Sequence, residues 1–274
     1  MPELPEVETI ARKLRPVLTG RSIDSIEVLW PRTVDRPDLD VFLTAITGAQ
    51  VLDVGRRGKY LQMPLDTGRT LLVHLRMSGK FVVQSDGDGV VDDVHTRVRL
   101  QLDDDTWVHY IDPRKFGRFY LVDDPQTVVG HLGPEPLSPA FTVGWLAEHL
   151  ENRRGEIKRL LLDQRFIAGL GNIYVSEALW QAGVHPQRIA GSLNDDEVRR
   201  LHAAIASVLR AGVANGGTSL GDRQYVYPDG GLGQHQTQLR VYDRAEAQCL
   251  RCGYAIERIV QGQRSTYFCP VCQK

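Results

Sequence analysis

The residues with the most specific chemical pattern are the four cysteines, which all lie in the last 26 residues of the 274-residue chain. They form two CxxC pairs, Cys249 with Cys252 and Cys269 with Cys272, and sixteen residues separate the pairs. Thiolates at this spacing fit a tetrahedral zinc site, and two disulfides are the alternative. Disulfides are disfavoured in a chain that we expect to be cytosolic. We therefore predict one structural Zn²⁺, which supplies folding energy to a segment too short to bury a core and leaves no coordination position open for catalysis.

The second candidate for chemistry is the opening MPELPEVE, in which Pro2 and Pro5 stand among Glu3, Glu6 and Glu8. Proline suits the first turn of an α-helix, and carboxylates there complement the positive end of the helix dipole. Taken alone, these residues predict the start of a helix. Whether they also react depends on the rest of the chain.

The first half of the chain must supply the elements that hold this opening. Apolar residues recur at helical spacing from Val7 to Leu18, and Gly20 ends the run. Six β-like runs follow between residues 22 and 122, separated by turn signals and interrupted by a short helix around 38–46. We predict an α+β protein whose N-terminal part, residues 1–132, is a β-sandwich flanked by helices.

A proline-rich break, GPEPLSP at 133–139, separates this part from a helical region. We expect helices over about 155–163, from Asn172 onward and over 194–214, and a long glycine-rich loop at 215–234. The predicted second domain covers 133–235, and the zinc finger covers 236–274. We expect Asn172, which follows Gly169 and Gly171, to cap its helix and to leave an anion-binding helix end.

Composition limits the classes of function. The net charge of −1 does not by itself indicate nucleic acid, but residues 151–274 hold 16 Lys and Arg against 12 Asp and Glu, whereas residues 1–150 hold 17 against 22. The acids of the first half cluster at 86–93 and 103–105, which we interpret as solvated hairpin tips, so a basic face elsewhere stays possible. The opening lacks a secretory signal and no apolar stretch is long enough to span a bilayer, so we expect a cytoplasmic, nucleoid-associated protein with no membrane partner.

Taken in order, the motifs of the chain resemble those of the formamidopyrimidine-DNA glycosylases (MutM), bacterial base-excision repair enzymes, over essentially its whole length. The motifs are MPELPEVET, RRGKYL (56–61), HLRMSG (74–79), DPRKFGR (112–118), AGLGNIYVSEALW (168–180) and GQRSTYFCPVC (262–272). The related endonuclease VIII branch typically starts with a Pro-Glu-Gly-Pro-Glu pattern, so PELPEVE favours the formamidopyrimidine branch. Arg76 stands where many relatives have glycine, and His235 stands where the resemblance leads us to expect an aromatic residue.

The resemblance gives the opening a chemical role. If Met1 is removed, Pro2 carries a free secondary amine with a pKa of about 8, against about 10.4 for a lysine, and an uncharged amine can attack a sugar C1′. The resulting iminium acidifies the C2′ proton, so the strand can be cut by β- and δ-elimination. The resemblance implies that Glu3 protonates the opened sugar oxygen, that Lys59 assists elimination, and that Arg264, in a predicted hairpin of the finger, binds the phosphates beside the lesion and promotes δ-elimination.

The resemblance also implies residues that contact DNA and the lesion. Met77, Arg114 and Phe116 would fill the gap left by the extruded base, although Met77 and Phe116 taken singly are more typical of a core. The further DNA contacts that it implies are His74, His95, Arg154, Lys158, Asn172 and Tyr242. His74 and His95 have a second interpretation, as satisfied sheet histidines. The expected lesion contacts are Glu6, which is otherwise a solvated helix acid, and Thr218 and Ser219 of a loop that we expect to be mobile until it closes over the base.

We therefore predict a bifunctional DNA glycosylase and abasic-site lyase for oxidised purines such as 8-oxoguanine and formamidopyrimidines. It would act as a monomer on double-stranded DNA that contains an oxidised base or an abasic site and lies in the cleft between the domains. Two alternatives stay open: an endonuclease VIII-like glycosylase for oxidised pyrimidines, and a zinc-finger DNA-binding protein without catalysis.

Overall fold

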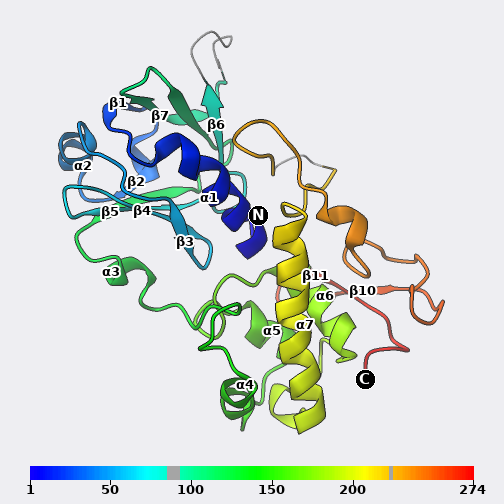
Figure 1. Ribbon diagram of the computed structural model, residues 1–274. Helices are drawn as coiled ribbons and strands as arrows, with labels where there is room; N and C mark the ends of the chain where they lie inside the picture. Colours follow the sequence, from blue (N-terminus) through cyan, green and yellow to red (C-terminus); the bar gives the residue numbers. More distant parts are fainter. Residues whose placement is uncertain (85–92, 222–224) are drawn as a thin grey trace. The chain divides into compact units, whose positions relative to one another are not determined.

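The computed structural model describes residues 1–84, 93–221 and 225–274, and Figure 1 shows their helices and strands. These residues divide into two compact units, Met1–His131 with Asn215–Gln234, and Leu132–Ala214 with His235–Lys274. The acidic hairpin tip expected at 86–93 lies outside the described residues except for Asp93. The second expected tip, 103–105, joins two strands and is exposed as predicted.

Two β-sheets make up most of the first unit. The four-stranded sheet has the order β1-β7-β8-β6, with antiparallel neighbours throughout. Its strands are β1 (Ile23–Val28), β6 (Lys80–Gln84), β7 (Thr96–Leu102) and β8 (Trp107–Ile111). The five-stranded sheet has the order β2-β9-β5-β4-β3, in which β2 runs parallel to β9 and the other pairs are antiparallel. Its strands are β2 (Val34–Arg36), β3 (Gly55–Arg57), β4 (Tyr60–Pro64), β5 (Thr70–His74) and β9 (Arg118–Val122).

The two sheets share one hydrophobic core with helices α1 (Leu4–Leu18) and α2 (Leu39–Ile46). On α1 the residues Val7, Ile10 and Leu14 are fully buried, because their spacing places them on one face of the helix. The same helix packs against β3 and β4. The predicted β-sandwich, its first helix and the short helix near 38–46 are therefore confirmed. Two shorter elements complete this part of the unit, a 3₁₀ turn at Pro31–Thr33 and α3 (Gln126–Val129).

The glycine-rich stretch 215–234 belongs to the first unit, whereas the sequence led us to place it with the helical domain. The reason is a set of bonds to the first unit. The Thr218 N–H donates to Glu6, Lys13 forms an ion pair with Asp229, and the Val83 N–H donates to the carbonyl of Pro228. Tyr225 is buried in the core of the sandwich. Residues 222–224 of this stretch lie outside the described residues.

The second unit is helical and ends in the finger. Its elements are α4 (Val143–Leu150), α5 (Ile157–Leu162), α6 (Asn172–Ala182), α7 (Asp195–Ala214), two 3₁₀ turns at Ala190–Ser192 and His235–Gln238, and the hairpin β10 (Glu257–Gln261) with β11 (Arg264–Phe268). The predicted helices near 155–163, from Asn172 and over 194–214 are confirmed, and Gly169 turns the chain before α6 with φ +87°. No helix in the part of the chain that the structure describes is long and apolar enough to cross a membrane.

Candidate active site and DNA-binding residues

The start of α1 places Pro2 and Glu3 at a helix N-terminus, as the opening residues predict. Glu3 is the N-cap residue and Pro5 lies in the first turn, where its missing N–H is not needed. The Glu3 N–H donates to Glu6 Oε2 at 2.9 Å, which fixes the backbone next to Pro2. Pro2 and Glu3 are both buried, whereas Met1 is exposed. The first residue is therefore accessible for removal, and the second is held in place.

Glu6 joins the N-terminus to the glycine-rich loop. While its Oε2 accepts from Glu3, its Oε1 accepts the N–H of Thr218 at 2.8 Å. Gly217 permits this contact, because it adopts φ +80° and a β-carbon there would lie 2.9 Å from Glu6 Oε1. The structure thus gives Glu6 two bonds that position other groups, a role that the sequence did not reveal. Its contact with the lesion base stays a prediction.

Ser219, the second loop residue implied by the resemblance, closes the loop on itself. Its hydroxyl donates to the carbonyl of Tyr225 and accepts the N–H of Gly233, both at 2.9 Å. The Tyr225 hydroxyl donates to the carbonyl of Gly216 at 2.9 Å. The two described ends of the loop are therefore bonded to each other and to α1. Its expected mobility without DNA stays a prediction.

Lys59 occupies the turn between β3 and β4, directly after Gly58, whose φ of +56° suits a tight hairpin. Its side chain is largely buried. The neighbouring Arg56 forms an ion pair with Glu8 of α1 at 2.9 Å, which holds this hairpin against the helix. Lys59 thus lies on a hairpin that packs against the helix carrying Pro2 and Glu3.

His74 ends β5 and is held as a neutral imidazole. Its Nδ1 accepts the N–H of Arg76 at 2.9 Å, so the ring proton resides on Nε2. Burial, followed by the positive charges of Arg76 and Lys59, lowers the pKa of His74 to about 3. A neutral ring in this tautomer offers one N–H donor whose presence does not depend on pH near neutrality. The structure therefore combines both interpretations of His74, because the ring is buried in the sheet and also carries a defined donor.

Met77, Arg114 and Phe116 come from two turns of the first unit. Met77 lies in the turn between β5 and β6 and is 40% exposed, and Phe116 lies between β8 and β9 and is 48% exposed. The Arg114 guanidinium lies over the Phe116 ring, 4.8 Å from its centroid. Exposed side chains of this kind contribute nothing to the core, which favours the resemblance-based interpretation over the core interpretation. His95 is exposed too, and its Nδ1 lies 3.3 Å from an Arg97 nitrogen.

In the second unit, Lys158 and Asn172 both bond to the finger hairpin. The Lys158 Nζ is buried and donates to Thr266 Oγ1 at 2.7 Å and to the Ser265 carbonyl at 3.2 Å, and Asn172 Nδ2 donates to the same carbonyl at 2.9 Å. The first residue of α6 is Asn172 and its N-cap is Gly171, so the expected capping by Asn172 is corrected. Their contacts with DNA stay predictions, while their visible bonds fix the strand that carries Arg264.

Arg264 begins β11 and is exposed, in the hairpin that the sequence predicted. The two turn residues before it, Gly262 and Gln263, have φ values of +53° and +64°, as in the two-residue turns that match the twist of a hairpin. Its guanidinium is therefore presented at the tip of the finger hairpin. Arg154 is exposed as well and lines a surface cavity of about 650 Å³ together with Arg153 and Arg159.

The four cysteines come together as predicted. Their sulfur atoms all lie within 4.8 Å of one another, with Cys249 and Cys272 sulfurs at 3.9 Å and Cys252 and Cys269 sulfurs at 3.5 Å. Tetrahedral coordination at about 2.3 Å from a central zinc requires sulfur pairs about 3.8 Å apart. The cysteines are not joined as disulfides. The cluster therefore fits a structural Zn²⁺.

Reasoning from the sequence did not identify the role of Glu177 on α6. Its carboxylate is buried and accepts the backbone N–H groups of Arg240, Val241 and Tyr242 at 2.8 to 3.0 Å, which positions Tyr242. Burial raises the pKa of Glu177, and the three backbone donors oppose the rise. The available signal was that Glu177 is the one charged residue of this helix.

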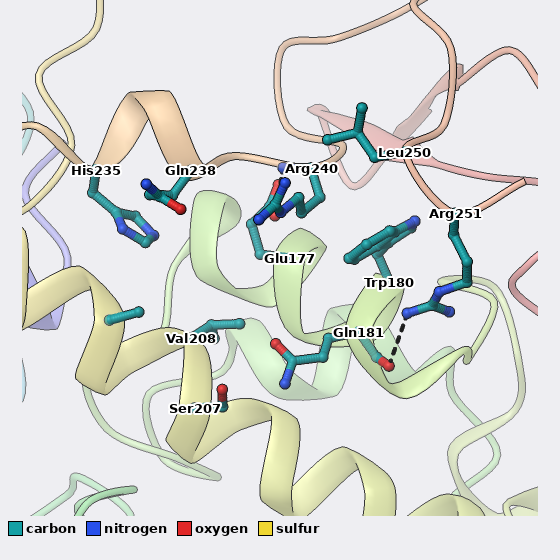
Figure 2. A pocket seen from close by; sticks show the side chains of 11 residues that line it. Glu177, Trp180, Gln181, Ser207, Val208, His235, Gln238, Arg240, Leu250 and Arg251 are labelled. Atoms are coloured by element: carbon teal, nitrogen blue, oxygen red, sulfur yellow. Dashed lines mark hydrogen bonds between the residues drawn. The ribbon is translucent and has the colours of Figure 1, made fainter. Parts of the chain in front are cut away.

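A cavity of about 500 Å³ adjoins Glu177, between α6, α7 and the finger (Figure 2). Arg251 stacks on Trp180 there and donates to the Gln181 carbonyl at 3.3 Å. His235 also lines this cavity and stacks on Tyr174 with ring centroids 5.5 Å apart. The imidazole of His235 thus takes part in ring stacking at the position where the resemblance led us to expect an aromatic residue.

Comparison with known proteins gives matches along the whole chain. Residues 1–119 match the formamidopyrimidine-DNA glycosylase N-terminal domain, residues 132–224 its H2TH domain, and residues 248–274 the zinc finger found in FPG and IleRS. A formamidopyrimidine-DNA glycosylase of Chloroflexus aggregans is 48% identical over 277 residues, which cover 100% of this chain and 98% of that protein.

Solved structures agree with these matches. The crystal structure of the MutM (Fpg) protein of Thermus thermophilus has a TM-score of 0.90 at 40% identity and covers 99% of this chain and 98% of that one. The Lactococcus lactis Fpg matches with TM-scores of 0.91 in a complex with abasic-site DNA and 0.89 in a complex with Fapy-dG DNA. The Lactococcus chains in these two complexes are 35% and 34% identical to this chain. Each match covers 99% of this chain, and the two matches cover 99% and 100% of the Lactococcus chains, respectively.

Proposed function

The chain belongs to the formamidopyrimidine-DNA glycosylase family, and from this premise we propose which residues carry each step of the reaction. It is a bifunctional DNA glycosylase and abasic-site lyase that acts on oxidised purines in DNA. We propose that it works as a monomer on double-stranded DNA in the cytoplasm. Its relatives are bacterial, and the Lactococcus lactis protein has been crystallised with damaged and abasic-site DNA.

The nucleophile is the amine of Pro2 after removal of Met1. α-Amines have an ordinary pKa of about 8, against about 10.4 for a lysine, so a terminal amine is uncharged far more often at neutral pH than a lysine. The Pro2 lone pair attacks C1′ of the damaged nucleotide, the bond from C1′ to the base breaks, and the base leaves with that electron pair and a proton. The exposure of Met1 and the fixed backbone of Glu3 support this assignment.

Glu3 acts next to the nucleophile as the acid that protonates the sugar ring oxygen. When the C1′–O4′ bond opens, the nitrogen lone pair forms the iminium, and O4′ needs a proton to leave as a hydroxyl. A buried carboxyl group at the helix N-terminus is adjacent to the amine through the chain itself. Glu6, which accepts the Glu3 N–H, positions this group.

Strand cleavage follows from the iminium as an electron sink. Removal of the C2′ proton expels the 3′ phosphate, and a second proton loss from the conjugated product expels the 5′ phosphate. Lys59, on the hairpin that packs against α1, assists the first elimination, and Arg264, at the tip of the finger hairpin, binds the phosphate that leaves in the second. An arginine fork suits this contact, because it can donate two parallel hydrogen bonds to phosphate oxygens.

Access to C1′ requires the damaged nucleotide to leave the stack. We assign Met77 and Phe116 to the vacated space and Arg114 to the orphaned base, because all three extend from the first unit on exposed turns. Backbone phosphates would be contacted by the neutral N–H of His74 in the first unit. Such contacts position the duplex and carry little sequence information. The other assigned contacts are His95, Arg154, Lys158, Asn172 and Tyr242.

The observation that carries the catalytic assignment is the position of Pro2, directly before a buried Glu3 whose N–H is fixed by Glu6. The experiment is borohydride reduction of the protein on abasic-site duplex DNA, followed by peptide mapping of the crosslink. We expect the crosslink at the Pro2 nitrogen. A crosslink at Lys59 would contradict the assignment. Excision rates on 8-oxoguanine and thymine-glycol duplexes, measured in parallel, test the preference for oxidised purines.

A further inference from the structure

The side chains assigned to the vacated space come from two separate turns. Both turns donate hydrogen bonds to the same buried carboxylate. We propose that Asp112 is a positioning residue that couples the Met77 turn to the turn of Arg114 and Phe116, so that the three side chains enter the duplex as one unit. This inference rests on the roles proposed above for these three residues. It adds a residue that contacts neither base nor phosphate.

The Asp112 carboxylate is 1% exposed and accepts hydrogen bonds from both turns. Its Oδ1 accepts the Ser78 hydroxyl at 2.6 Å, and Ser78 directly follows Met77. The same Oδ1 accepts the Arg114 N–H at 3.2 Å, and Oδ2 accepts the Gly117 N–H at 2.8 Å. Charge-assisted bonds are strong in a buried setting, so the two turns are held by one rigid acceptor.

The packing around Tyr110 brings the same two turns together independently of these bonds. The Tyr110 hydroxyl lies 3.5 Å from Asp112 Oδ2, and a glycine from each turn lies against it. A β-carbon on Gly79 would lie 2.3 Å from the Tyr110 oxygen, and one on Gly117 would lie 1.7 Å from it. Both positions therefore need glycine, because any side chain would separate the turns.

Each turn also contains a residue in the left-handed region that glycine favours. Arg76, directly before Met77, has φ +56°, and Lys115, between Arg114 and Phe116, has φ +60°. Such conformations persist where the surrounding bonds over-determine them, and they cluster at functional sites. The bonds to Asp112 hold both turns in these conformations next to the residues that would enter the duplex.

The main chain of Asp112 extends the network to a third segment. Its N–H donates to the His95 carbonyl at 2.9 Å, and its carbonyl accepts the Arg97 Nε at 2.9 Å. Coupling through a buried network of this kind predicts non-additive effects of mutations in the parts that it joins. A purely structural role would lower stability and leave the two turns energetically independent.

The test is a mutant cycle on single-turnover excision of 8-oxoguanine from a duplex, with 2-aminopurine opposite the lesion site as a fluorescent report of insertion. Met77→Ala and Phe116→Ala are combined in the parent protein and in Ser78→Ala. This substitution removes the bond between the Met77 turn and Asp112 and also the direct bond from the Arg114 N–H to Ser78 Oγ at 3.3 Å. In the parent protein, the loss of excision rate in the double variant should be about tenfold smaller than the product of the losses in the two single variants, and this ratio is the coupling factor. With Ser78→Ala this coupling factor should fall toward one, to the part that the packing around Tyr110 still carries.

This test includes a second variant of the network and a control variant. Asp112→Asn keeps Oδ1 as the acceptor for the Ser78 hydroxyl and the Arg114 N–H but replaces Oδ2 by a donor, so it breaks the bond to Gly117 and should lower the coupling factor without abolishing it. Ser25→Ala is the matched control, because its exposed hydroxyl on β1 donates to Gln101 at 3.2 Å away from both turns. It should leave the coupling factor unchanged. Urea unfolding of each variant identifies any that do not fold.

The outcomes separate this inference from the proposed function. A coupling factor that is unchanged in both Ser78→Ala and Asp112→Asn would overturn the inference and leave the assignment of Met77 and Phe116 intact. If Met77→Ala and Phe116→Ala lose no excision while borohydride still traps Pro2, those two roles are wrong and the inference is refuted with them. Loss of trapping in the parent protein would instead contradict the proposed nucleophile.

Discussion

His74 should make the first unit less stable in mild acid. Its folded pKa of about 3 lies far below the ordinary value of 6.5, because burial and the charges of Arg76 and Lys59 disfavour the imidazolium. Below pH 6.5, His74 therefore binds a proton in the unfolded chain but not in the folded chain. The stability linked to His74 is complete above pH 6.5 and is lost as the pH falls from 6.5 toward 3.

The size of the effect follows from these two pKa values. Each pH unit between them changes the free energy of unfolding by about 1.4 kcal/mol per proton, so lowering the pH from 7 to 5 should cost roughly 2 kcal/mol. His109, whose pKa is also lowered by burial, acts in the same direction within the first unit. A substitution at His74 isolates its share.

The assay is urea unfolding at pH 7 and pH 5 with Trp145 and Trp180 replaced by Phe, which leaves Trp30 and Trp107 to report on the first unit. The variant is His74→Asn, whose side-chain oxygen can still accept the Arg76 N–H but does not titrate. We expect the parent to lose about 2 kcal/mol more than the variant between the two pH values. An equal pH dependence of both proteins would refute the assignment of His74 as a neutral, sheet-bound donor.

Three further perturbations test other parts of the account. Cys269→Ser should release the zinc and weaken DNA binding by displacing Arg264, while the unfolding transition of the first unit stays unchanged; full zinc content in this variant would contradict the metal assignment. Gly217→Ala should cut 8-oxoguanine excision at least about tenfold, because its methyl group would lie 2.9 Å from Glu6 Oε1 at φ +80° and should displace the loop from Glu6, whose Oε2 stays bonded to the Glu3 N–H. Cleavage of a ready-made abasic site should stay within about twofold, and an equal loss on both substrates would show that the loop is only structural. Lys158→Met removes the two hydrogen bonds from Lys158 to the finger hairpin, each of about 1.5–3 kcal/mol. The ratio of δ- to β-elimination products on a sequencing gel should then fall. An unchanged ratio would argue against a role of Lys158 in positioning Arg264.

Periodicity and turn chemistry predicted much of the fold from the sequence. The apolar spacing of Val7, Ile10 and Leu14 gave the first helix, and the paired CxxC motifs gave the cysteine cluster, because both patterns are local. The hairpin of Arg264 was predictable as well, since Gly262 and its neighbour form a two-residue turn. The finger and the helical region form one compact unit in the structure, although their sequences differ in composition.

The parts that could not be predicted depend on bonds between residues distant in the sequence. Glu6 reads as a helix-start acid, and only the fold shows that it accepts an N–H from Thr218, 212 positions away. For the same reason the loop at 215–234 could not be assigned to the first unit, because its glycine content says nothing of Tyr225 in the core. Asp112 begins the motif DPRKFGR, yet its bond to Ser78 across 34 positions has no sequence signature.

The central claim is that the amine of Pro2 performs the chemistry, and the most direct measurement changes the position of that amine. The mature protein, a form that retains Met1, and Pro2→Gly are compared for excision and strand cleavage on an 8-oxoguanine duplex, with DNA affinity as the control for folding. We expect activity in the mature protein, none in the form that retains Met1, and most lyase activity lost in Pro2→Gly, with binding preserved in all three. Full strand cleavage by protein whose Met1 is shown to be intact would contradict the claim.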